Sequence, residues 1–208
     1  MLVPSSGWRA LALALLLGLG LAGCDDPASR PIVGIENRLP DLQFSLQAAG
    51  GRTVTQNDVR GHIALVFFGY ANCPDVCPAT MARLAQLTDD LGDDADEIRV
   101  LFISVDPHRD TPEMLERYVS AFQNPSAIGL SGSAAETERL ARRYRVSFQI
   151  LEPANPGDSN YVVNHSKGVF VFDRQGEVSL LVPDIDAPGA AAALTAAVRS
   201  QIDASRAG

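Results

Sequence analysis

An uninterrupted apolar run followed at once by a pair of cysteines limits most strongly how this chain can fold. The run covers residues 62–70 (HIALVFFGY), and its lack of polar alternation predicts a strand that is covered on both faces. Cys73 and Cys77 come next, and apolar residues then recur at helical spacing over residues 77–91. The sequence therefore predicts a buried strand, a loop that holds two cysteines, and a helix.

The rest of the chain alternates between strands and helices in the same way. Ser133 and Glu136 form a capping box that predicts the start of one helix. The full prediction adds a hairpin at residues 42–47 and 52–56, strands at 98–105 and 148–151, helices at 112–122, 133–144 and from about 190, and a second hairpin at 168–172 and 177–182. This alternation predicts an α/β sheet with helices on both faces. Because the cysteine pair directly follows the first central strand, the thioredoxin-like fold is the natural candidate.

The N-terminal segment has a different character. Residues 10–22 (ALALALLLGLGLA) form an apolar run too short for a hydrocarbon core of roughly 30 Å, but suited to the apolar region of a signal peptide. The run ends in Leu21-Ala22-Gly23-Cys24, which resembles the lipobox of bacterial lipoproteins. That resemblance implies cleavage before Cys24 and lipidation of this cysteine. Ordinary secretion and an uncleaved anchor are the alternatives.

These features divide the chain into three parts. We expect a lipoprotein signal peptide at residues 1–23, a polar tether at 24–38, and a thioredoxin-like domain at 39–208. The lipid would hold the protein to a membrane of the bacterial cell envelope. Asp25 and Asp26 resemble a signal for retention at the inner membrane, which favours the periplasmic face of that membrane.

Charge and cysteine usage narrow the possible functions. The formal net charge of −8 argues against a nucleic-acid-binding protein, because such proteins carry a basic surface. If Cys24 carries lipid, Cys73 and Cys77 are the two remaining thiols. The cell envelope is oxidising, so this pair either forms a disulfide or is kept reduced for a purpose.

Cys73 is expected in the loop that leaves the buried strand and Cys77 where the helix begins, and this location favours thiolates over thiols. Pro78 suits the first helical position, so backbone N–H groups and the positive end of the helix dipole point toward the sulfurs. Thiolates are the nucleophiles of disulfide exchange and also the soft ligands that select Cu(I). Redox thioredoxins have two residues between their cysteines, whereas this chain has three. The longer spacing is suited to binding a metal ion through both sulfurs. A redox disulfide remains geometrically possible, and a plain stabilising disulfide is a further alternative.

Two thiolates alone leave a copper ion under-coordinated, so a third ligand is expected. The chain has three histidines, and His62 at the start of a strand is expected to be exposed, while His108 lies in a loop. His165 is expected to open the strand 166–172, after a loop that contains Pro153, Pro156 and Gly157. Thioredoxin-like redox enzymes place a cis-proline in this region, facing the cysteines. Because this chain has no proline between Pro156 and Pro183, His165 is the candidate that completes a Cys₂His site.

A second polar cluster, Asp106-Pro107-His108-Arg109-Asp110-Thr111-Pro112, follows the predicted strand 98–105. Ligands of open α/β sheets bind at the carboxyl ends of the strands. Turn chemistry explains most of these residues, since Thr111 is a typical helix cap and Pro112 a typical first helical residue. Arg109 and the two carboxylates can additionally position the site or a partner.

Three segments resemble the Sco/SenC family of copper proteins. FFGYANCPDVCP (67–78) is similar to the family's CxxxCP signature, ISVDPHRDTP (103–112) to its DPxRDTP segment, and VNHSKGVFVFD (163–173) to its histidine strand. The resemblance covers the chain from about residue 39 to the C-terminus. One departure is that the family commonly has Asp before the histidine, where this chain has Asn164. That change affects either the orientation of the imidazole or the docking of a partner.

The resemblance implies a copper-binding domain of thioredoxin-like fold, with Cys73, Cys77 and His165 as ligands of Cu(I) and Cu(II). The family serves the assembly of respiratory haem–copper oxidases. The leading hypothesis is therefore a metallochaperone, which is not an enzyme and passes copper to an oxidase subunit or to another copper chaperone. The alternative is a thiol–disulfide oxidoreductase that keeps a partner's cysteines reduced. In either case, a thiol reductant protein is an expected partner of the redox-capable pair.

Overall fold

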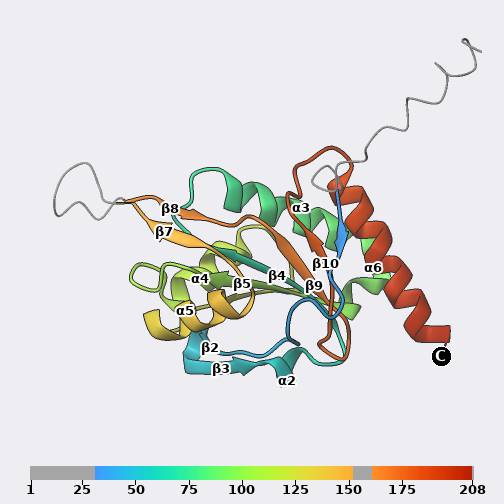
Figure 1. Cartoon of the computed structure of the whole chain (residues 1–208), viewed down its shortest axis with the longest axis horizontal. Coiled ribbons are helices and arrows are strands. Elements are labelled where there is room, and N and C mark those ends of the chain that lie inside the picture. The colour runs from blue at the N-terminus through green and yellow to red at the C-terminus, as the bar shows by residue number, and fades with distance from the viewer. Residues whose placement is uncertain (1–30, 152–160, 208) are drawn as a thin grey trace, which may run out of the picture. The chain divides into compact units, whose positions relative to one another are not determined.

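A mixed six-stranded sheet forms the centre of the computed structural model, which describes residues 31–151 and 161–207 (Figure 1). The strands lie in the order β1-β10-β9-β4-β5-β6. In this order they span Val33–Gly34, Val178–Val182, Val169–Phe172, Ile63–Gly69, Ile98–Ser104 and Ala127–Leu130. Within the described ranges, no helix has the length and apolar character needed to cross a membrane.

The parallel half of the sheet positions the cysteines. Strands β4, β5 and β6 run parallel, with helix α3 (Val76–Leu91) between β4 and β5, and helix α4 (Pro112–Ser120) between β5 and β6. Every residue of β4 is buried, as its uninterrupted apolar run predicts. Gly69 pairs with Ser104 at the carboxyl ends of β4 and β5. The cysteine loop and the loop after β5 therefore start side by side.

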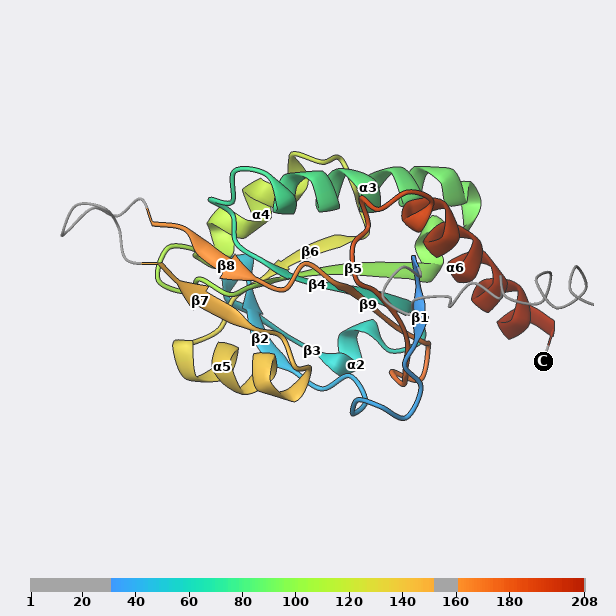
Figure 2. The ribbon, with the colours of Figure 1, turned by 45° about the horizontal axis from the view of Figure 1, so that its top comes forward.

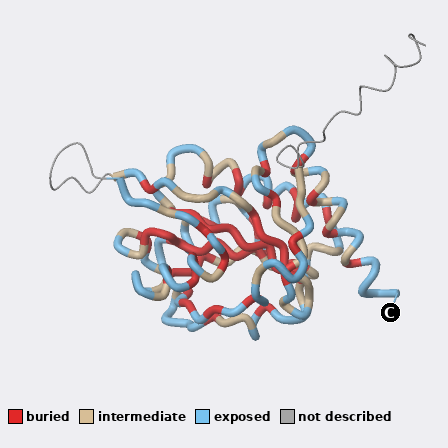
Figure 3. The backbone as a smooth tube through the Cα atoms, viewed as in Figure 1, coloured by how far each residue is buried: buried red, intermediate tan, exposed pale blue. Residues whose placement is uncertain are grey.

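Helices cover both faces of the sheet, as predicted. Figure 2 shows α3, α4 and α6 (Ala190–Ala207) on one side, with α5 (Ala134–Arg143) and the hairpin of β2 (Ser45–Ala48) and β3 (Arg52–Thr55) on the other. The buried backbone is concentrated in the central strands (Figure 3). The remaining short helical elements are η2 (Ala49–Gly51), α2 (Gln56–Val59) and η3 (Gly92–Glu97).

Alternation along β4 divides the aromatic core between the two faces. The ring of Phe68 lies 6.3 Å from that of Tyr144, next to α5. The ring of Phe67 points to the other face, where it lies 6.0 Å from the ring of Phe102 and 6.0 Å from the imidazole of His165. Successive residues of a strand point to opposite faces. Phe67 therefore joins the core to the side of the sheet that holds the candidate site.

A two-stranded ribbon extends beyond the main sheet on the side of the cysteine loop (Figures 1 and 2). Its strands are β7 (Phe148–Ile150) and β8 (Val163–His165), which pair antiparallel. Phe148 pairs with His165 and Ile150 with Val163. The sequence-based prediction that His165 opens the strand 166–172 is wrong, because His165 ends β8 and a separate strand, β9, begins at Val169.

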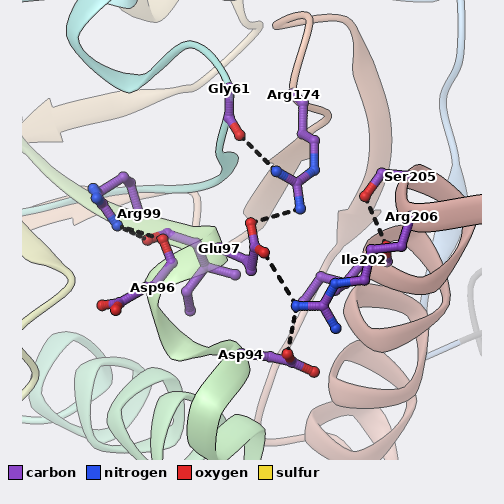
Figure 4. A network of polar contacts seen from close by, with 10 residues as sticks. Gly61, Asp94, Asp96, Glu97, Arg99, Arg174, Ile202, Ser205 and Arg206 are labelled. Carbon is purple, nitrogen blue, oxygen red and sulfur yellow. Dashed lines mark hydrogen bonds and ion pairs between the residues drawn. The ribbon is translucent and has the colours of Figure 1, made fainter.

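Ion pairs hold the C-terminal helix α6 at the end of the sheet opposite the cysteine loop (Figure 4). The carboxylate of Glu97 accepts from Arg174 at 2.6 Å and from Arg206 at 3.1 Å. Arg206 also reaches Asp94 at 2.7 Å, and Arg174 donates to the carbonyl of Gly61 at 2.8 Å. The two guanidinium groups lower the pKa of Glu97. This network joins α6, the β9–β10 turn and η3, and it lies away from the cysteines.

Besides β8, the structure adds two strands that were not predicted. The short strand β6 (Ala127–Leu130) extends the parallel half beyond β5. The strand β1 (Val33–Gly34) pairs with β10, although these residues fall within the expected tether at 24–38. Residues 1–30, which include the expected signal peptide and Cys24, lie outside the described residues.

Candidate metal centre

Three side chains with metal-binding atoms converge beyond the carboxyl end of β4. The sulfurs of Cys73 and Cys77 and a ring nitrogen of His165 all lie within 4.8 Å of one another. Cys73 and Cys77 are both thiols in this structure, and neither is in a disulfide. Cys77 is completely buried, whereas Cys73 and His165 are half-buried. Solvent therefore reaches the group through Cys73 and the imidazole, and not through Cys77.

Local backbone structure explains how the two cysteines reach this point. Helix α3 begins at Val76 with Asp75 as its N-cap, one residue before the predicted range 77–91, so Pro78 is its third residue and not its first. Pro78 still fits, because the first helical N–H groups have no partner within the helix. The backbone N–H of Cys77 points at the sulfur of Cys73 at 3.5 Å. This contact confirms that a backbone N–H of the first turn faces the sulfur of Cys73.

Gly69 makes room for the buried thiol. A Cβ atom at this position would lie 2.9 Å from the sulfur of Cys77 and 2.9 Å from a ring carbon of Phe102. A glycine inside a strand often marks such a close approach. Because both neighbours belong to the packed core, we infer that a larger residue at position 69 would displace the sulfur.

His165 presents one defined nitrogen to the sulfurs. Its Nδ1 lies 2.9 Å from the carbonyl oxygen of Ser166, and its Nε2 lies 3.3 Å from the sulfur of Cys77. A carbonyl oxygen only accepts hydrogen bonds, so Nδ1 carries the proton and donates it. Nε2 is then the ring nitrogen that faces the thiols, and its lone pair can bind a metal ion when it carries no proton. The rings of Phe67 and Tyr70 stand edge-on to the imidazole at 6.0 and 5.7 Å and form its apolar walls.

The pKa values of the two thiols are shifted in opposite directions. A hydrogen bond from Cys77, together with the backbone N–H groups of Asp75 and Cys77 and the imidazole of His165, lowers the pKa of Cys73. Its hydrogen bond with Cys73 and its burial raise the pKa of Cys77. Cys77 therefore holds the proton that the pair shares, and Cys73 supplies the thiolate. A metal ion that binds both sulfurs must displace that proton.

This difference predicts selective alkylation of the purified, reduced protein by iodoacetamide. The thiolate is the reactive form, so an ordinary thiol reacts roughly tenfold more slowly for each pH unit below its pKa. Because the pKa of Cys73 is lowered, its alkylation rate should stay nearly constant from about pH 8 down to about pH 6. Cys77 should react only after unfolding. Peptide mass spectrometry at each pH measures both rates, and equal labelling of the two cysteines in the folded protein would contradict the assignment.

Comparison with known proteins identifies the family to which this site belongs. A family model described as SCO1/SenC matches residues 35–200. The chain belongs to the SCO1/SenC family. The SCO2-like protein of Rickettsia prowazekii is 30% identical over 175 residues, which cover 80% of this chain and 84% of that protein. The human SCO1 homolog, a mitochondrial protein, is 35% identical over 185 residues, which cover 82% of this chain and 59% of the human protein.

Solved structures agree with this assignment. The copper-bound ScoI protein of Bradyrhizobium japonicum is 32% identical, with a TM-score of 0.67 over 77% of this chain and 98% of that one. Copper-bound yeast Sco1 is 30% identical, with a TM-score of 0.65 over 77% of this chain and 90% of that one. The predicted thioredoxin-like α/β fold is therefore confirmed for the described domain of this SCO1/SenC protein.

The other two histidines are not among the three converging side chains. His62 is half-buried at the entry to β4, at the opposite end of that strand from the cysteines, so the expectation that it is exposed is wrong. His108 is exposed in the loop after β5. The loop residues Pro153, Pro156 and Gly157 lie outside the described residues. Of the three histidines, His165 alone joins the cysteines.

Asn164 faces away from the sulfurs. It pairs with Gln149, and both residues are exposed. Because neighbours on a strand alternate between faces, the side chain of Asn164 lies on the opposite face of the ribbon from His165. The departure from the family's Asp thus changes an outer surface of the ribbon, where a partner can touch it, and leaves the three converging side chains unchanged.

The cluster after β5 combines turn chemistry with support for the site. Thr111 caps α4 and Pro112 is its first residue, as predicted. Asp110 is buried, accepts from the hydroxyl of Ser104 at 2.6 Å, and accepts from the backbone N–H of Ala71 at 3.1 Å. It thereby ties the cysteine loop to β5. The sequence placed this carboxylate near the site but did not predict its partners, which depend on the pairing of β4 with β5.

Proposed function

We propose that this protein binds one copper ion through Cys73, Cys77 and His165 and passes it to a partner during assembly of a respiratory haem–copper oxidase. The convergence of two sulfurs and Nε2 within 4.8 Å carries this proposal. Two soft thiolates and an imidazole suit copper, and thiolates in particular select Cu(I). Copper-bound relatives of the same family and fold support the choice of metal.

The position of His165 favours the metallochaperone over the oxidoreductase. Disulfide exchange needs an attacking thiolate and a second thiol, which Cys73 and Cys77 supply by themselves. It does not need an imidazole whose Nδ1 is held by Ser166 while Nε2 faces the sulfur of Cys77. Metal sites use this arrangement, in which a hydrogen bond at one ring nitrogen orients the other toward the metal.

The oxidoreductase remains the second candidate because the acidities of the two thiols suit it. The lowered pKa and partial exposure of Cys73 make it a competent nucleophile, and Cys77 lies within reach to resolve a mixed disulfide. A single protein can use the same pair for both purposes. In this second function the partner is a copper-receiving protein whose cysteines must be reduced, and a thiol reductant protein regenerates the pair.

Titration of the reduced protein with Cu(I) in the presence of a competing chelator tests the leading proposal. We expect one copper per chain and release of about one proton, because Cys77 must lose the proton that it shares with Cys73. Copper should then move to the apo form of a recipient oxidase subunit when the two are mixed. Binding no stronger than that of the oxidised protein would contradict the proposal.

We also propose that Cys24 carries the lipid that holds the protein at the periplasmic face of the inner membrane. The Leu21–Cys24 sequence and the two following aspartates support this location. Mass spectrometry of the mature protein should find diacylglycerol on an N-terminal Cys24, and Cys24→Ser should leave the precursor unprocessed. A mature N-terminus at another residue, without lipid, would overturn the anchor.

A further inference from the structure

The ribbon that carries His165 needs support from outside itself. Strands β7 and β8 pair over three residues each and are not part of the six-stranded sheet. A short two-stranded ribbon is only marginally stable by itself. A metal ligand must nevertheless be held near its binding geometry, so contacts between the ribbon and the domain determine where the imidazole lies.

Asp106 and Arg109, in the loop after β5, provide such contacts to Tyr161, which lies two residues before β8. Nε of Arg109 donates to one carboxylate oxygen of Asp106 at 2.5 Å, and the hydroxyl of Tyr161 donates to the other at 2.7 Å. Nη1 of Arg109 donates to the carbonyl oxygen of Tyr161 at 2.9 Å. The guanidinium carbon lies 3.6 Å from the centre of the Tyr161 ring. Arg109 therefore holds both the backbone and the ring of Tyr161.

Tyr161 lies two residues before β8, so a short stretch of backbone connects it to His165. Within β8, the buried side chain of Val163 points to the same face as that of His165, because side chains two residues apart along a strand share a face. Tyr70 adds a second connection, because its ring lies 5.7 Å from Arg109 and 5.7 Å from the imidazole of His165. A displacement of Tyr161 therefore shifts the segment 161–165, and with it the imidazole of His165.

We propose that Arg109 is a positioning residue for copper binding, which clamps Tyr161 so that Nε2 of His165 meets the two sulfurs. The inference rests on the proposed copper site. Asp106 is completely buried and its ion pair fixes the guanidinium of Arg109. The clamp, which consists of Asp106, Arg109 and Tyr161, is therefore anchored in the loop after β5. Arginine suits this position because its planar guanidinium can stack on a ring while it donates in two directions. Lysine keeps the charge beside Asp106 but cannot do both.

Copper affinity of the purified protein and of its Arg109→Lys and Tyr161→Leu variants tests the clamp. Loss of a group that orients a metal ligand typically weakens binding about 10- to 100-fold. We expect a loss in that range for both variants, together with weaker nitrogen coupling in the electron paramagnetic resonance spectrum of the Cu(II) form. Tyr161→Leu keeps the Asp106–Arg109 ion pair, so it tests the clamp even if Arg109→Lys fails to fold.

The matched control is Arg143→Lys on the opposite face of the sheet. Arg143 also lies against a tyrosine ring, 5.8 Å from the centre of Tyr144, and donates to a backbone carbonyl, that of Asp41, at 3.1 Å. This variant should bind copper like the unaltered protein. An equal loss of affinity in Arg143→Lys would overturn the proposal, because the effect would then reflect general stability.

The same substitutions in a His165→Ala background separate the clamp from the copper site. If Arg109 acts through His165, Arg109→Lys should cause no further loss once the imidazole is absent. Additive losses would overturn the clamp while leaving the copper site in place. If His165→Ala itself bound copper normally, the proposed Cys₂His site would fail, and the clamp would fail with it. Normal affinity in both Arg109→Lys and Tyr161→Leu, with His165→Ala impaired, would overturn the clamp alone.

Discussion

Cys77→Ser is expected to abolish the thermal stabilisation of the reduced protein by copper. A ligand present at a thousand times its Kd stabilises the folded state by about 4 kcal/mol. For a domain of about 170 residues, this raises the melting temperature by on the order of 10 °C. Serine is nearly isosteric with cysteine, but its hydroxyl is a hard donor that does not replace a thiolate on Cu(I). Differential scanning calorimetry with and without one equivalent of copper measures the effect.

Two further variants make this result specific. Cys73→Ser should lose the copper-dependent shift as completely as Cys77→Ser, because both sulfurs are proposed ligands. His108→Ala should retain the shift, since His108 is exposed in the loop after β5 and is not one of the three converging residues. A shift of the same size in Cys77→Ser would mean that copper binds elsewhere, for example on the acidic surface, and would remove the basis of the proposed site.

The sequence predicted those parts of the fold whose signals are local and strong. Strand β4 is an uninterrupted apolar run whose residues are all buried, and β5 is apolar except for Arg99 and Ser104. Helix α5 begins at the predicted capping box, with Ser133 as N-cap and Glu136 completing it. The strand β6 gives a weaker signal, because it is four residues long and contains Gly129. Gly129 faces the backbone of Leu115 in α4, where a Cβ would come within 2.8 Å, so tertiary packing determines its place.

The three converging residues were predicted, but the contacts that orient them were not. The CxxxC spacing and the absence of a proline near His165 are visible in the sequence, and the structure brings these side chains together. The stacking of Arg109 on Tyr161 joins residues 52 positions apart, and no pattern in the sequence pairs them. The hydrogen bond that orients His165 depends on the turn after β8, which the sequence placed inside a longer strand. Local patterns thus identify the chemical groups, whereas strand pairing and loop contacts fix their geometry.

His165→Ala is expected to weaken copper binding while leaving the thiol pair able to cycle between dithiol and disulfide. Removing one of three ligands should lower affinity by at least about tenfold to a hundredfold, at 1.4 kcal/mol per decade. Disulfide exchange needs Cys73 and Cys77 alone, so the rate at which a small disulfide oxidises the pair should change far less than copper affinity. Chelator competition measures the first quantity and thiol titration the second. His108→Ala is the control, because it removes an exposed imidazole that lies outside the site.

The same variant separates the two candidate functions in cells. If the protein delivers copper, a His165→Ala strain should lose haem–copper oxidase activity, and excess copper should restore it, because higher metal concentration compensates for a weaker site. If the protein acts mainly as a reductant, the strain should keep its oxidase activity while a Cys73→Ser strain loses it. Normal copper binding and full oxidase activity in the His165→Ala variant would remove the imidazole from the site. The geometry around Cys73 and Cys77 would then be explained by disulfide exchange with a partner, with the partly exposed Cys73 as the attacking thiolate.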